Sequence, residues 1–158
     1  MSRSDTQSTI CIAGLGSPHG DDQAGWLVIE ELERLQPINA RLITLTAPHQ
    51  LLNEIEGLDT LYVCDAAASR CHVGTIQWFD GPKLPEAAVK PCSTHNPTLS
   101  SVLALIDQLT SDNLKIRVAS IAGEQWRLMS QPNTAVAEAA RKLAYEIVQE
   151  LSGVATRG

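Results

Sequence analysis

The chain has 158 residues, 44% of them apolar, and carries a net charge of -6 with an isoelectric point near 5.1. This length can bury one core and is too short for two ordinary domains, so we predict a single domain over residues 1–158 with flexible ends at 1–8 and 152–158. The acidic balance argues against nucleic acid or an anionic membrane as a partner, because both bind basic patches.

The start of the chain and its apolar runs predict a cytoplasmic protein without membrane insertion. No apolar run approaches the roughly 20 residues that cross a bilayer, and residues 1–9 lack the basic start and apolar core of a signal peptide.

Strands and helices alternate along the chain. In chain order, apolar periodicity predicts a strand (9–15), a helix (22–35), a strand (40–46), a short helix (51–55), two strands (60–64 and 74–79), a helix (98–109), a strand (115–121) and a helix (133–151). The polar loop before the strand at 74–79 lets that strand run antiparallel at an edge. We therefore predict an α/β fold: a three-layer α/β/α sandwich around a mostly parallel five-stranded sheet with one antiparallel edge strand.

The turn after the first predicted strand carries two neighbouring carboxylates, Asp21 and Asp22. Glycines in such a turn can cradle a phosphate, but these two acids would repel an anion, which argues against nucleotide binding. Two interpretations stay open. Asp21 caps the helix while Asp22 complements the helix dipole, or one of the acids faces a crevice and binds a cation with ligands from elsewhere in the chain.

Further candidate ligands follow the pattern of the predicted sheet. Asp65 comes directly after the buried strand 60–64, and His95 precedes the helix at 98–109. Ligands bind beyond the carboxyl ends of parallel strands, where Asp22, Asp65 and His95 could converge. Two carboxylates and an imidazole suit a divalent transition metal with open coordination positions. The alternative is that Asp65 caps a turn and His95 caps its helix.

The four cysteines form no Cys-x-x-Cys pair, which argues against a zinc knuckle or a dense disulfide framework. Cys11 and Cys64 lie inside apolar strands and are expected in the core. Cys92 is a candidate thiol nucleophile only if it shares a pocket with His95.

Three stretches together resemble the signatures of the hydrogenase maturation proteases. They are residues 14–25, residues 62–66 (Tyr-Val-Cys-Asp-Ala) and residues 93–95 (Ser-Thr-His). Proteins of this family are endopeptidases that trim the C-terminal tail from the large-subunit precursor of nickel-iron hydrogenases. The order and spacing of the stretches agree from about residue 9 to residue 150, so the resemblance implies this activity and this protein partner.

The resemblance also implies roles for three residues. The metal-contacting acid of the family falls on Asp22, its strand-end aspartate on Asp65 and its histidine on His95. In this family the nickel belongs to the incoming substrate, so these side chains would recognise a metal already inserted in the precursor. The enzyme would then act through this metal site and carry no permanently bound cofactor.

The chain departs from the family pattern at three places. Ser17 stands where Asn is usual, Gln23 stands where Gly is usual, and the segment 48–51 (Pro-His-Gln-Leu) replaces an Asp-Gly-Gly turn. The last difference makes His49 and Gln50 candidate substrate-binding residues. It also resembles the subgroup that serves soluble, bidirectional or NAD-linked hydrogenases.

The sequence alone leaves two alternative functions open. The substitutions at Ser17 and Gln23 favour a non-proteolytic binder of metal or precursor that has kept the fold. The same three ligands would also serve a conventional hydrolase with its own zinc.

Overall fold

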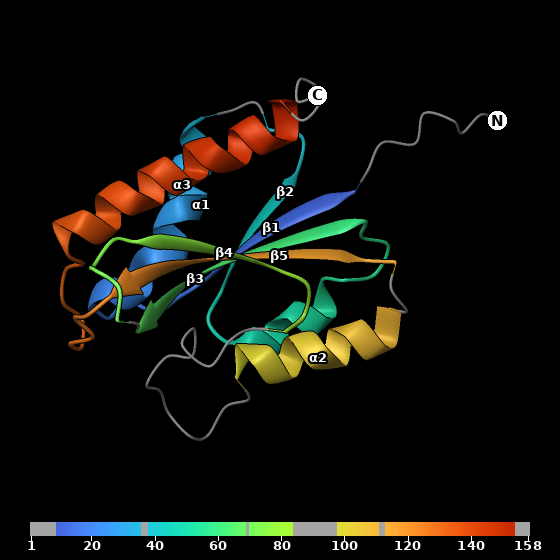
Figure 1. Ribbon diagram of the computed structural model, residues 1–158, viewed down its shortest axis with the longest axis horizontal. Coiled ribbons are helices and arrows are strands. Elements are labelled where there is room, and N and C mark those ends of the chain that lie inside the picture. Colours follow the sequence, from blue (N-terminus) through green and yellow to red (C-terminus); the bar gives the residue numbers. More distant parts are fainter. Residues whose placement is uncertain (1–8, 36–37, 69, 84–97, 111–112, 154–158) are drawn as a thin grey trace.

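The computed structural model describes residues 9–35, 38–68, 70–83, 98–110 and 113–153 (Figure 1). The segment that contains Cys92 and His95 lies outside these residues. So do the predicted flexible ends, except residues 152–153, which belong to the last helix.

The strands form one mixed sheet in the order β2-β1-β3-β5-β4. Its members are β1 (Ile10–Leu15), β2 (Arg41–Leu45), β3 (Thr60–Ala68), β4 (Ile76–Asp80) and β5 (Lys115–Gly123). The pairs β1–β2, β1–β3 and β3–β5 are parallel, and β4 runs antiparallel to β5 at one edge. The predicted sheet, including its reversed edge strand, is confirmed.

Helices cover both faces of this sheet, which gives the predicted three layers (Figure 1). One face carries α1 (Ala24–Arg34) and α3 (Thr134–Gly153), and the other carries α2 (Leu99–Thr110) with the 3-10 helix η2 (Pro48–Asn53). A second 3-10 helix, η1 (Gly20–Gln23), leads into α1. None of the helices in the described part of the chain has the length and apolar character needed to cross a bilayer.

Alternation along the central strand β3 divides the core into two halves. Tyr62 and Cys64 pack with α1 and α3, whereas Leu61 and Val63 pack with α2 and η2. Asp65 continues the second set and therefore lies on the α2 face of the sheet. The predicted core positions Cys11 and Cys64 are confirmed, since both are buried.

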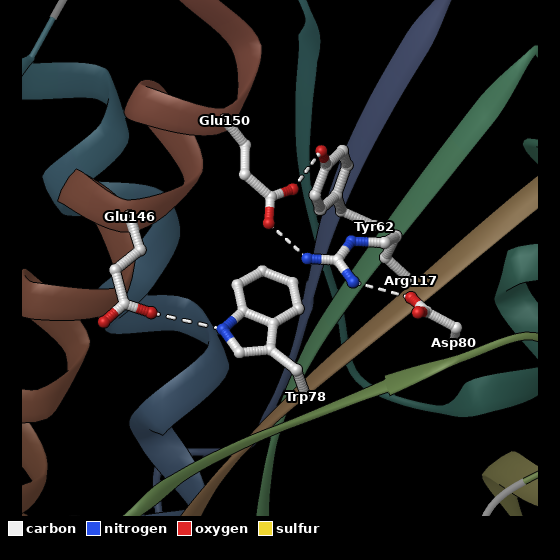
Figure 2. Close-up of polar contacts among 6 residues, drawn as sticks. All are labelled: Tyr62, Trp78, Asp80, Arg117, Glu146 and Glu150. Atoms are coloured by element: carbon white, nitrogen blue, oxygen red, sulfur yellow. Dashed lines mark hydrogen bonds and ion pairs between the residues drawn. The ribbon is translucent and has the colours of Figure 1, made fainter. Parts of the chain in front are cut away.

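Polar contacts attach α3 to the edge of the sheet (Figure 2). Glu146 and Glu150 of α3 accept hydrogen bonds from the ring nitrogen of Trp78 and the hydroxyl of Tyr62, at 3.2 and 2.8 Å. The Arg117 guanidinium, on β5, pairs with Glu150 and with Asp80 of β4. We call these six residues the α3 cluster: Tyr62, Trp78, Asp80, Arg117, Glu146 and Glu150.

Most predicted boundaries differ from the observed ones by one or two residues, and three of the differences affect the carboxyl edge of the sheet. The helix predicted at 22–35 begins as η1 and becomes α-helical only at Ala24. The short helix predicted at 51–55 lies at 48–53, where the Gln50 side chain closes its first turn. The strand predicted at 60–64 continues to Ala68, because β5 pairs with it along that whole length.

Candidate active site

Asp65 lies at a step in the carboxyl edge of the sheet. The β1–β3 ladder ends with the pair Gly14 and Cys64, whereas the β3–β5 ladder continues to Ala68. Asp65 is therefore inside β3, contrary to the prediction, yet it is the first β3 residue beyond the last β1–β3 pair, level with Leu15 at the end of β1. The residue is 8% exposed, and one carboxylate oxygen accepts a hydrogen bond from the Ala66 amide at 2.8 Å.

Two glycines let α1 approach this edge at backbone distance. A Cβ on Gly25 would lie 2.2 Å from the Leu15 carbonyl oxygen and 2.4 Å from that of Cys64, and a Cβ on Gly14 would lie 2.2 Å from the Gly25 carbonyl. Any side chain at either position would push the helix away from the sheet. The close approach brings η1, which immediately precedes α1, into contact with β3.

Asp22 lies in η1 and is half-buried. The Ser17 hydroxyl donates a hydrogen bond to its carboxylate at 2.6 Å, and the Ser17 amide donates to its carbonyl at 3.1 Å. A hydroxyl-to-carboxylate bond of this length is charge-assisted. The departure from the family pattern at Ser17 thus supplies a residue that orients the proposed metal-contacting acid.

Asp21, next in the chain, is fully buried and has a different role. Its carboxylate accepts hydrogen bonds from the amides of Glu124, Gln125 and Asn133 at 2.9, 2.9 and 2.6 Å, and a longer one from the Asn133 side chain. Burial alone would raise the pKa of Asp21, but these donors together hold it below its ordinary value.

These bonds show that Asp21 does not cap the helix that follows it. The residues at the N-cap positions of η1 and α1, His19 and Gln23, make no side-chain cap either. Asp21 instead fastens the β5–α3 loop, which we define as residues 124–133, to the turn after β1. The interpretation of Asp21 as a local cap was therefore wrong.

The structure describes only two of the three proposed metal ligands. Asp22 and Asp65 both lie at the carboxyl edge, on segments in contact, whereas His95 is outside the described residues. No three His, Cys, Asp or Glu side chains within the described ranges form a group that could hold a metal ion. The helix after His95, α2, is antiparallel to the parallel strands, so its first turn faces their carboxyl ends (Figure 1).

The candidate substrate-binding residues lie at the same edge, after β2. The Gln50 side-chain oxygen accepts hydrogen bonds from the amides of Thr46 and Ala47 at 2.8 and 3.0 Å, so it shapes the turn into η2. His49 is exposed beside it. Their role in substrate choice stays a prediction.

Sequence reasoning missed two further contacts of the turn after β1. The imidazole of His19 accepts a hydrogen bond from the Met129 amide at 3.0 Å, and the Gln23 side-chain amide donates to the Ser130 carbonyl at 3.0 Å. Both partners lie more than 100 residues along the chain, and no local pattern signals them.

Of the cysteines, Cys64 lies one residue before Asp65 in the described structure. Burial is the main reason that the pKa of its thiol rises to about 12, with a smaller contribution from Asp65. The thiol therefore stays protonated near neutral pH and is a poor nucleophile. Cys92 lies outside the described residues.

Comparisons with known proteins agree with this architecture. The fold is similar to that of the [NiFe] hydrogenase maturation protease HycI of Thermococcus kodakarensis KOD1, with a TM-score of 0.74 and 24% identity over 92% of this chain and 94% of that one. It is also similar to the hydrogenase maturating endopeptidase HybD of E. coli, with a TM-score of 0.71 and 21% identity over 91% and 94%. A search of curated proteins finds no match.

A match to a protein-family model assigns the chain to a family. The model described as hydrogenase maturation protease matches residues 27–150, which include Asp65 and His95 and begin just after Asp22. This match covers well over half of the chain, and the solved structures above share its fold. The chain therefore belongs to the hydrogenase maturation protease family and is a peptidase.

Proposed function

We propose that this peptidase removes the C-terminal extension of a nickel-iron hydrogenase large-subunit precursor after nickel has been inserted, and that it does so in the cytoplasm. Family membership supports the reaction class. The observation that carries the proposal is the placement of Asp22 and Asp65 on contacting segments at the carboxyl edge of the sheet. Asp22 is held by a hydrogen bond from Ser17, and Asp65 is held by its position in β3.

In this proposal the nickel arrives as part of the substrate. Asp22, Asp65 and His95 complete its coordination when the folded precursor docks, since carboxylate and imidazole are ligands that divalent transition metals accept. The bound metal then polarises the scissile carbonyl or activates a water molecule, and a carboxylate moves the proton. A precursor without nickel lacks the group that these residues recognise, so it is not cut.

The test measures the mass of the precursor before and after incubation with the purified protein. Nickel-loaded precursor loses its C-terminal extension, and metal-free precursor does not. The isosteric variants Asp22→Asn and Asp65→Asn, and His95→Ala, lower the rate by about a hundredfold or more, with an unchanged circular dichroism spectrum. Glu124→Gln is the matched control, because it removes an exposed carboxylate near the same edge.

Each outcome has a distinct meaning. Full activity in any one of the three variants removes that residue from the site. No cleavage of nickel-loaded precursor by the wild-type protein contradicts the proposed substrate. Cleavage of metal-free precursor by protein that contains stoichiometric zinc would instead identify a hydrolase with its own metal.

A further inference from the structure

The β5–α3 loop presents two apolar side chains to solvent at the carboxyl edge. Leu128 is 72% exposed and Met129 is 71% exposed, more than any other large apolar side chain in the described ranges. The loop follows the end of β5, beside the turn that holds Asp22 (Figure 1). We call Leu128 and Met129 the apolar tip.

The base of this loop is tied to the turn after β1. The buried Asp21 carboxylate accepts the amides at both ends of the loop, and the Asp21 amide donates to the Gln125 carbonyl at 2.6 Å. Gly20 donates to the Ser130 carbonyl at 3.0 Å. A Cβ on Gly20 would lie 2.3 Å from the Gln125 carbonyl oxygen, so the two segments are in backbone contact.

Hydrogen bonds inside the loop also order its tip. The Gln125 side chain accepts from the Arg127 amide at 2.8 Å and donates to the Gln131 carbonyl at 2.7 Å. The Ser130 hydroxyl donates to the Arg127 carbonyl at 2.8 Å. The loop therefore has a defined conformation in which its apolar residues point away from the core.

Met129 also holds an unfavourable backbone conformation. Its φ of 54° makes it the one non-glycine residue with positive φ among the described residues, and the bond from its amide to His19 helps to keep it there. A strained backbone and an exposed apolar side chain do not stabilise the isolated protein. Such residues are often retained at functional surfaces.

We propose that the apolar tip inserts into an apolar recess on the folded body of the large-subunit precursor and so sets the scissile segment over the carboxylates. This inference rests on the proposed function, because it takes the same precursor as the partner. The loop is bonded to residues 19–23, and Asp22 lies among them, so a partner seated on the tip is placed in a fixed relation to Asp22.

The physical character of the tip fits a protein partner. A preordered loop loses little conformational freedom on binding, and the flexible thioether of Met129 adapts to an irregular recess. An anionic membrane would be repelled by a chain of net charge -6.

The test titrates wild-type protein and the double variant Leu128→Ser/Met129→Ser with folded, nickel-loaded precursor, and measures cleavage in parallel. We expect the dissociation constant and the KM to rise about tenfold or more, since well-packed apolar anchors dominate binding. The kcat stays within about twofold, because the tip does not touch the reacting atoms. The melting temperature is unchanged, because neither side chain is in the core.

Two controls make the result specific. Leu109→Ser/Tyr145→Ser removes two other exposed apolar side chains, 62% and 57% exposed, on α2 and α3. It should bind and cut like the wild type. Leu128→Met keeps an apolar side chain and should retain wild-type affinity.

The outcomes separate this inference from the proposed function. Equal affinity of wild type and the tip variant overturns the inference even if cleavage is efficient, and so does an equal loss in the control variant. If the wild type binds the precursor through the tip without cutting it, the inference stands and the proposed reaction fails. If the wild type neither binds nor cuts, both fail.

Discussion

Two polar regions of this molecule are built on opposite principles. In the α3 cluster, charges of opposite sign meet: the Arg117 guanidinium pairs with Glu150 and Asp80 and lies 4.3 Å from the centre of the Trp78 ring (Figure 2). In the turn after β1, the Asp21 carboxylate is held by uncharged donors, three of them backbone amides.

The difference determines what each region can do. The α3 cluster pairs its one cation with two of its three carboxylates and serves to attach a helix to the edge of the sheet. The turn keeps the negative charge of Asp21 at the carboxyl edge, because the amides hold the pKa of that group down. Its neighbour Asp22 accepts a hydrogen bond from the Ser17 hydroxyl rather than from the loop amides. Asp21 therefore holds the loop in place, whereas Asp22 lies at the carboxyl edge.

The largest expected effect comes from deleting the carboxylate that builds the loop. Asp21→Ala leaves the part-buried amides of Glu124, Gln125 and Asn133 without their acceptor, and an unsatisfied group shielded from water costs about 1 to 3 kcal/mol. We expect the free energy of unfolding, measured with urea, to fall by about 3 to 5 kcal/mol. Glu124→Ala is the control and should change it by less than about 0.5 kcal/mol. If Asp21→Ala lowered the free energy of unfolding no more than Glu124→Ala does, the hydrogen bonds from the three amides would not stabilise the fold.

The sign of the pH dependence follows from the lowered pKa of Asp21. Its contribution to stability is complete above the unfolded-state pKa and is lost as the pH falls through the lower folded-state pKa. The stability gap between wild type and Asp21→Asn should therefore be constant above about pH 5 and should shrink below about pH 4. A gap that widens on acidification would contradict the assignment.

A smaller effect is expected at Arg117 in the α3 cluster, because its side chain is only partly buried. Arg117→Met removes both ion pairs and the contact with Trp78, and leaves Glu150 without its cation. We expect a loss of about 1 to 2 kcal/mol. Arg34→Met is the matched control, because Arg34 pairs at 3.6 Å with Glu31 on the surface and is itself 73% exposed. That change should be near zero.

The comparison also shows which features could be predicted from the sequence. Apolar periodicity is a local signal, and it predicted the helix at 133–151, in which Val136, Leu143 and Ile147 are fully buried. The polar loop before β4 was enough to predict the reversed edge strand. The strand pattern placed Asp22 and Asp65 at the carboxyl edge of the sheet, and the described segments that carry them are in contact there, whereas the roles that the family resemblance implies for them stay predictions.

Features that depend on distant partners could not be predicted. Nothing near Asp21 indicates that its carboxylate meets Asn133, and nothing near His19 indicates Met129. The end of β3 depends in the same way on the length of β5, which is why Asp65 was predicted after the strand rather than inside it. The role of His95 stays a prediction.

The smallest effect on stability is expected at Ser17, where a moderate loss of activity should accompany it. Ser17→Ala removes the hydroxyl that donates to Asp22, and the exposed side of the turn lets water replace it, so the free energy of unfolding should change by about 1 kcal/mol or less. If Ser17 positions Asp22, the kcat for nickel-loaded precursor falls about threefold to tenfold while the KM is kept. Ser17→Asn, which restores a donor and is the residue usual in this family, should recover most of that loss. An unchanged kcat in Ser17→Ala would show that this hydrogen bond only stabilises the turn, and that the orientation of Asp22 is set by its backbone alone.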